Sequence, residues 1–110
     1  MRNRLQHLFI VAALGILASA CSKGGGGPQG APLTGAAIFN QSCRDCHRIN
    51  EEGGIVGPDL TKVGARRDRE FLDQVLRDPS KKYPGATMPP YASLPPEQFK
   101  LLLDYLTTLK

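Results

Sequence analysis

Two cysteines separated by two residues and followed directly by a histidine constrain this 110-residue chain more than any other feature. They form the segment Cys43-Arg44-Asp45-Cys46-His47. On one side of a helical turn, both thiols can reach the same planar ligand. Cys-x-x-Cys-His is the pattern at which haem is attached, with the histidine as the proximal iron ligand. The motif therefore predicts one covalent haem c, held by Cys43, Cys46 and His47.

Two other chemistries use paired cysteines, and the rest of the chain favours neither. A zinc site needs about four ligands at recognisable spacings, whereas the remaining candidates are His7 and Cys21, both near the N-terminus. A thioredoxin-like redox pair is expected beside a strand–helix–strand pattern, and the sequence shows no such alternation. Haem attachment is therefore the favoured interpretation.

The first 20 residues have the features of an export signal. Arg2 and Arg4 precede an apolar run over 8–17, which is followed by Ala18-Ser19-Ala20. A charged start, an apolar centre and small residues at the end are typical of a cleaved signal peptide. The alternative, a membrane span, needs about 20 apolar residues. We therefore expect residues 1–20 to be removed and the mature protein to lie in the bacterial periplasm.

Cys21 stands directly after this segment. Leu17-Ala18-Ser19-Ala20-Cys21 resembles a bacterial lipobox, although Ala18 occupies a position where leucine is usual. Ordinary cleavage would leave an unpaired thiol on an exported protein, and lipidation of Cys21 accounts for it. Residues 21–33 then form a lipidated cysteine and a glycine-rich linker, whose flexible part of eleven residues spans roughly 18 Å. This predicts attachment to a membrane through a lipid anchor.

The charge balance argues against nucleic acid as a partner. The chain carries 14 basic and 10 acidic residues, a formal net charge of +4. Loss of Arg2 and Arg4 with the signal leaves 12 basic against 10 acidic residues, or +2. No basic run is long enough to indicate a nucleic-acid surface.

Residues 34–110 are expected to form one all-α domain with long loops. A domain below about 80 residues rarely buries enough apolar surface alone, so the covalent haem is expected to hold it together. Thr34 is a candidate cap for a helix over 35–48, Asp68 for a second helix that ends at Arg77 before Pro79, and a third is expected over 96–109. Their apolar positions recur at helical spacing: Ala36, Phe39, Cys43 and Cys46; Phe71, Leu72, Val75 and Leu76; and Phe99, Leu102, Leu103, Leu106 and Leu109. No segment has the pattern of a strand of any length.

Met88 is the sole methionine beyond the signal and the expected distal iron ligand. Pro89 and Pro90 restrict the backbone after it, which would help to hold the thioether sulfur against iron. Packing is the ordinary role of a loop methionine. The sixth position on iron could then stay open, or it could be filled by Lys81, Lys82 or Tyr83.

Two further positions are candidates for contacts around haem. The segment Gly57-Pro58-Asp59-Leu60 begins ten residues after His47, and the Pro58 carbonyl could accept a hydrogen bond from the proximal imidazole. The alternative is a plain turn. Arg66 and its neighbour Arg67 could pair with a haem propionate, because guanidinium groups suit carboxylates. The alternative is a solvated arginine pair.

Together these residues resemble a class I cytochrome c of the short bacterial kind. The resemblance covers essentially all of 34–110 and rests on Gly35, Phe39, Cys43-x-x-Cys46-His47, Gly57-Pro58-x-Leu60, Arg66, Asp78-Pro79, Met88-Pro89 and Tyr105-Leu106. It implies three main helices around haem, the first and last crossing where Gly35, Phe39, Leu102 and Tyr105 meet. It also implies axial ligation by His47 and Met88, with Pro58 as the acceptor behind His47. The last helix departs from the family by opening with Pro95-Pro96.

The expected function is one-electron transfer by a membrane-tethered periplasmic carrier that is not an enzyme. A monomer that meets redox partners through transient contacts fits this interpretation, with Lys81 and Lys82 as part of the docking rim. Two alternatives stay open. One is a haem subunit of a larger oxidoreductase, and the other is a peroxidatic or gas-binding haem protein with a labile methionine ligand.

Overall fold

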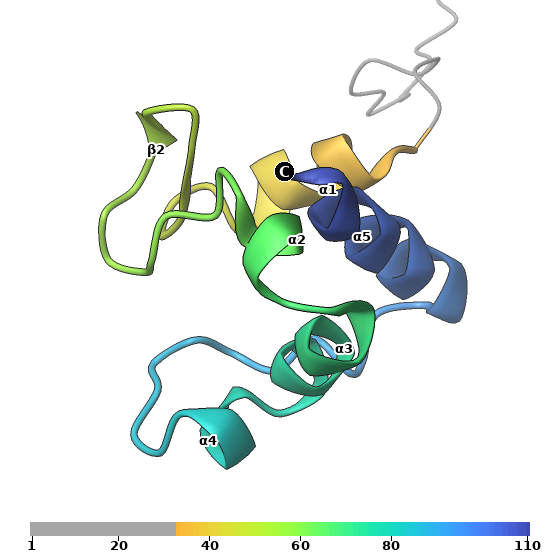
Figure 1. Cartoon of the computed structure of the whole chain (residues 1–110). Coiled ribbons are helices and arrows are strands. Elements are labelled where there is room, and N and C mark those ends of the chain that lie inside the picture. The colour runs from red at the N-terminus through yellow and green to blue at the C-terminus, as the bar shows by residue number, and fades with distance from the viewer. Residues whose placement is uncertain (1–32) are drawn as a thin grey trace, which may run out of the picture.

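The computed structural model describes residues 33–110, so the predictions for the signal peptide, Cys21 and most of the linker lie outside the described residues. Three longer helices dominate the described part (Figure 1): α1 (Gly35–Ser42), α3 (Arg69–Arg77) and α5 (Pro96–Thr108). Two single turns, α2 (Val63–Arg66) and α4 (Pro79–Lys82), and a short hairpin, β1 (Arg48–Ile49) with β2 (Glu52–Gly53), complete it. The predicted helical fold class is therefore confirmed. No helix in residues 33–110 is long and apolar enough to cross a membrane.

Side-chain caps start two of the longer helices, as the sequence predicts. The Thr34 hydroxyl accepts a hydrogen bond from the Ala37 N–H at 3.1 Å. The Asp68 carboxylate accepts one from the Phe71 N–H at 2.8 Å. Each cap satisfies an N–H group that the helix itself leaves unpaired. By contrast, α5 begins after Pro95 without a side-chain cap.

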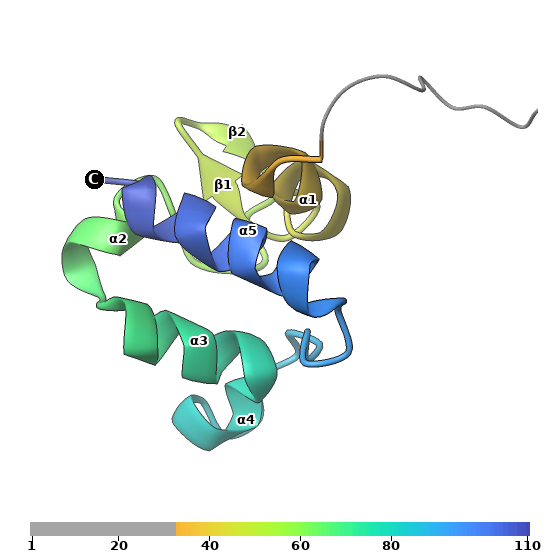
Figure 2. The ribbon, with the colours of Figure 1, turned by 90° about the vertical axis from the view of Figure 1, so that its right-hand side faces the viewer.

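The helices α1 and α5 cross in close contact, which Figure 2 shows from the side. A Cβ on Gly35 would collide with the Leu101 carbonyl oxygen, so only glycine permits this approach. Beside it the rings of Phe39 and Tyr105 lie 6.0 Å apart. The core includes Ile38, Phe39, Cys43, Val63, Leu72, Leu76, Phe99, Leu102, Leu103 and Leu106. The crossing implied by the family resemblance is thus present.

The structure corrects two predictions of secondary structure. The first helix ends at Ser42 rather than at residue 48, because the chain turns out of it at Cys43 (φ −122°, ψ −28°). The prediction that no strand forms is also wrong, since Arg48 pairs with Gly53 in an antiparallel hairpin. Its turn residues, Asn50 and Glu51, have positive φ values of 49° and 67°. Glutamate rarely adopts this conformation, so the sequence carries no ordinary hairpin signal.

Candidate haem site

The two cysteines lie on one backbone turn that follows α1 directly. The His47 N–H donates to the Cys43 carbonyl at 2.9 Å, and the Cys46 N–H donates to the same oxygen at 3.1 Å. The helical hydrogen bonding is thus renewed for one turn after the break. Cys43 is buried and Cys46 is exposed. This arrangement directs one sulfur into the domain and leaves the other at its surface.

The environment of Cys43 suits a neutral sulfur. Burial raises the pKa of its thiol to about 11, with a smaller rise from Cys46. An ionised thiolate is therefore disfavoured there. A thioether carries no charge, so the same burial does not oppose a covalent bond from this sulfur to a haem vinyl group.

The His47 imidazole is buried, with only 8% of the residue exposed. Its Nδ1 lies 2.9 Å from the Pro58 carbonyl oxygen. A carbonyl can only accept, so Nδ1 carries the proton and Nε2 is left with a lone pair for iron. A Cβ on Gly57 would lie 2.5 Å from the imidazole Cε1, so the backbone packs directly against the ring.

A network of hydrogen bonds holds the segment that carries Pro58. The Gly57 N–H donates to the Cys46 carbonyl at 2.7 Å, which links the segment to the cysteine turn. The Leu60 N–H donates to the Arg48 carbonyl at 2.8 Å. Arg66 Nη2 donates to the Asp59 carbonyl at 2.7 Å. The Pro58 carbonyl, which accepts the hydrogen bond from His47, is therefore held in place by bonds at the residues before and after it.

The two arginines expected near a propionate take different roles. Arg66 is exposed and braces the Asp59 carbonyl. Arg67 stacks on the Phe71 ring, with its guanidinium carbon 4.5 Å from the ring centroid. The sequence reasoning missed a third arginine, because Arg48 Nε is buried and unpartnered among residues 33–110. A buried unpaired donor is costly, which makes Arg48 a second candidate to meet a propionate.

Met88 is partly buried and packs against the hydrophobic core. The seven residues before it, 81–87, are all exposed. Among the competing ligands, Lys81 lies 3.7 Å from the Asp78 carboxylate and Lys82 lies over the Phe71 ring at 5.5 Å. Unlike Lys81 and Lys82, Met88 therefore packs against the hydrophobic core.

The residues present fit a covalent haem. Residues 33–110 supply two free thiols and a buried imidazole with its tautomer fixed. They also leave Ile55 79% and Val56 75% exposed beside the segment that packs on His47, apolar surface that a macrocycle could cover. No group of three His, Cys, Asp or Glu side chains in the described part of the chain could hold a bare metal ion.

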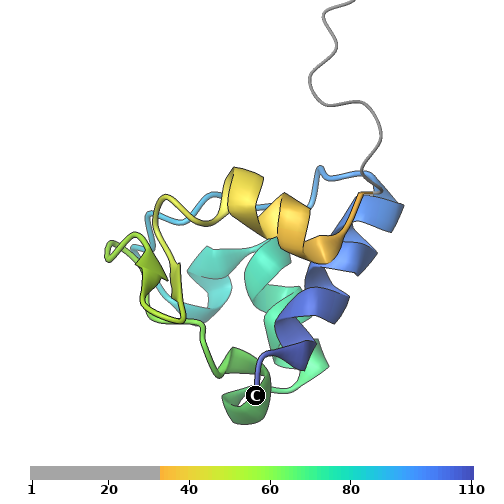
Figure 3. The same ribbon diagram turned by 90° about the horizontal axis from the view of Figure 1, so that it is seen from above.

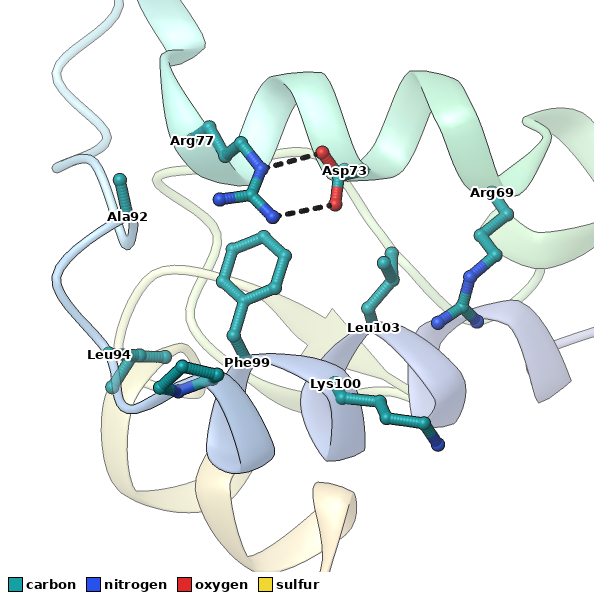
Figure 4. Close-up of a pocket in the computed structure, with 9 residues that line it drawn as sticks. Arg69, Asp73, Arg77, Ala92, Leu94, Phe99, Lys100 and Leu103 are labelled. Carbon is teal, nitrogen blue, oxygen red and sulfur yellow. Dashed lines mark hydrogen bonds and ion pairs between the residues drawn. The ribbon is translucent and has the colours of Figure 1, made fainter.

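A pocket of about 370 Å³ lies elsewhere, between α3 and α5 (Figure 4). Arg77 spans it, paired with Asp73 at 2.7 Å and stacked on the Phe99 ring at 4.3 Å. Cys43, Cys46, His47 and Met88 are not among the residues that line this pocket. It is therefore separate from the haem site.

The sequence of this chain is similar to known cytochromes c. A family model described as cytochrome c matches residues 33–110. The chain is 28% identical over 87 residues to cytochrome c-551 of Bacillus subtilis, a match that covers 71% of this chain and 77% of that protein. It is 32% identical over 85 residues to cytochrome c oxidase subunit 2 of Alkalihalophilus pseudofirmus, and 34% identical over 90 residues to that of Bacillus sp. PS3. Each of these two matches covers 69% of this chain but only 25% of the oxidase subunit.

Proposed function

Because the chain belongs to the cytochrome c family, as a single-haem class I member with covalently bound haem c, we propose that it is an electron carrier with iron ligated by His47 and Met88. The observation that carries the proposal is the fixed His47 tautomer, set by the contact of 2.9 Å between Nδ1 and the Pro58 oxygen. Met88, partly buried against the core, is the sole methionine in residues 33–110. Histidine with methionine is the ligand pair that raises the reduction potential of a c-type haem.

The contribution of the chain to this activity is rigidity around the two expected ligands. The bound haem supplies a one-electron redox centre. Pro58 fixes the orientation of the His47 ring, because its carbonyl oxygen accepts a hydrogen bond from Nδ1. Pro89 and Pro90 fix the backbone φ angles after Met88. With His47 and Met88 both held in place, little rearrangement would accompany a change in iron charge, and ligation by Met88 would leave no position for a substrate.

Absorption spectra of the purified holoprotein, oxidised and reduced, with and without CO, test the ligand set. We expect a methionine-to-iron(III) charge-transfer band in the oxidised protein and no rapid CO binding by the reduced protein, because Met88 must leave the iron first. Met88→Ala should lose the band and bind CO, whereas Lys82→Ala, a truncation in the same segment, should behave as wild type. A wild-type protein that lacks the band and binds CO readily would instead identify a gas-binding or peroxidatic haem protein.

The proposed location is the bacterial periplasm, with a lipid on Cys21 as the membrane anchor. The support is the sequence of the first 21 residues, in which an apolar run and three small residues precede the cysteine. Cys21→Ser should move the protein from the membrane fraction to the soluble fraction without changing its haem spectrum. If mass spectrometry shows no lipid on the mature wild-type protein, the anchor proposal is refuted. The electron-transfer proposal is unaffected by that result.

A fixed subunit of a larger oxidoreductase is the second candidate. The matches to two cytochrome c oxidase subunits 2 favour it, since a cytochrome c segment there forms part of a longer chain. Gentle solubilisation followed by size fractionation separates the two cases. A shuttle should migrate alone, whereas a subunit should migrate with a stoichiometric oxidoreductase partner.

A further inference from the structure

The end of the Met88 loop is fastened to the haem-attachment turn through one side chain, Tyr91. Its hydroxyl donates a hydrogen bond to the Ser42 carbonyl at 2.8 Å, across 49 positions of sequence. Ser42 is the last residue of α1 and immediately precedes Cys43. Figure 3 shows the segment that follows α4 passing beneath the end of α1. The contact therefore joins the loop of one expected iron ligand to the turn of the other.

The backbone of Tyr91 provides a second attachment. Its N–H donates to the Leu76 carbonyl at 2.7 Å, near the end of α3. Carbonyl groups in the last turn of a helix lack partners within the helix. Tyr91 thus satisfies one such carbonyl on α3 with its backbone and one on α1 with its side chain. A single residue fixes the loop relative to both helices.

This attachment can determine the position of Met88. Only Pro89 and Pro90 separate Met88 from Tyr91, and their φ angles are fixed by the pyrrolidine rings. On the other side of Met88, residues 81–87 are all exposed, and the backbone hydrogen bond within that stretch, from the Ala86 N–H to the Tyr83 carbonyl at 2.9 Å, joins the loop only to itself. Gly85, with φ +82°, has no atom within 4 Å of the place that a Cβ would occupy. Met88 is therefore held mainly from its C-terminal side.

We propose that Tyr91 is a positioning residue for the distal ligand, and that its hydroxyl keeps Met88 at the iron by tying the loop to Ser42. The proposal rests on ligation by Met88. It predicts that losing the hydroxyl increases the fraction of molecules in which Met88 has left the iron. A neutral hydrogen bond contributes about 1 kcal/mol net, which corresponds to roughly a fivefold increase in that fraction.

Tyr91→Phe tests this in the holoprotein, because it keeps the ring and the N–H bond to Leu76 and removes only the hydroxyl. We expect the methionine-to-iron(III) band to disappear on heating well before the helical circular dichroism. The reduced variant should bind CO about fivefold faster than wild type. Tyr83→Phe is the matched control, because Tyr83 opens the same loop and its hydroxyl makes no hydrogen bond within residues 33–110.

The outcomes separate this inference from the ligand assignment. If wild type shows the band and Tyr91→Phe matches it in thermal loss of the band and in CO binding, the positioning role is refuted. An equal change in Tyr83→Phe also refutes it, because the effect would then be a general loosening of the loop. If the wild-type protein lacks the band, Met88 is not the iron ligand, and the positioning role of Tyr91 is refuted as well.

Discussion

Gly57→Ala tests whether the close packing behind His47 holds the proximal ligand. The added Cβ would lie 2.5 Å from Cε1, 2.7 Å from Nδ1 and 3.0 Å from Nε2 of the imidazole. Ordinary van der Waals contact begins near 3.4 Å, so the ring or the backbone must move by about 0.9 Å. A displacement of this size away from Pro58 would lengthen the bond between Nδ1 and the carbonyl from 2.9 Å toward about 3.8 Å, beyond hydrogen-bond range.

The expected cost follows from this displacement. Overpacking a filled site costs about 1–3 kcal/mol. A buried donor left without its acceptor costs about 1–3 kcal/mol. Part of this is recovered because alanine restricts the unfolded chain more than glycine does, by about 0.4–1 kcal/mol. Together these contributions predict that the free energy of unfolding falls by about 1–6 kcal/mol.

Guanidinium unfolding of the oxidised holoprotein, followed by circular dichroism and by the Soret band, measures this loss. Gly64→Ala is the control, because its Cβ would collide with the Thr107 carbonyl oxygen, a similar clash against α5. Both variants should be less stable, but only Gly57→Ala should alter the haem spectrum under native conditions. If Gly57→Ala has wild-type stability and spectrum, the packing behind His47 is not what positions the ring.

Two further predictions concern the surface. Replacing Lys81 and Lys82 by glutamate should slow reduction by an acidic redox partner at low salt by about tenfold or more, because charge steers the encounter. Stopped-flow measurements give this rate. An unchanged rate would show that neither lysine belongs to the docking rim. Hydrogen bonds from Lys100 and Arg69 lower the pKa of Asp104, so its contribution to stability is present above the unfolded pKa and is lost as the pH falls through the folded value. Asp104→Asn should therefore flatten the dependence of the unfolding midpoint on pH below about 4, and a pH profile equal to that of wild type would contradict this.

Local signals in the sequence were sufficient for much of the helical framework. Thr34 and Asp68 cap the helices that they were predicted to cap, because an N-cap acts on an N–H group three residues away. The spacing of the cysteines likewise predicts a shared turn, and backbone hydrogen bonds form it. Such features depend on a few consecutive residues, so one sequence contains the information needed to find them.

Features that depend on distant segments were missed or misjudged. The contact between Tyr91 and Ser42 joins residues 49 positions apart, and no local pattern indicates it. The end of α1 at Ser42 was missed because the apolar spacing continues through Cys46 while the backbone turns at Cys43. The buried, unpartnered Nε of Arg48 depends on how the hairpin packs, which the sequence does not show.

The supports of the two expected ligands differ in kind. The His47 ring is enclosed by backbone, with Gly57 packed against it and Pro58 accepting its proton. Met88 depends on a loop that is exposed on one side and held on the other by Tyr91. Backbone contacts persist until the domain unfolds, whereas a loop held by few contacts can open locally at lower free energy. The methionine is therefore expected to leave the iron before the histidine does. Under the proposed ligation, Tyr91 rather than the Cys-x-x-Cys-His motif would then limit how long the haem stays six-coordinate.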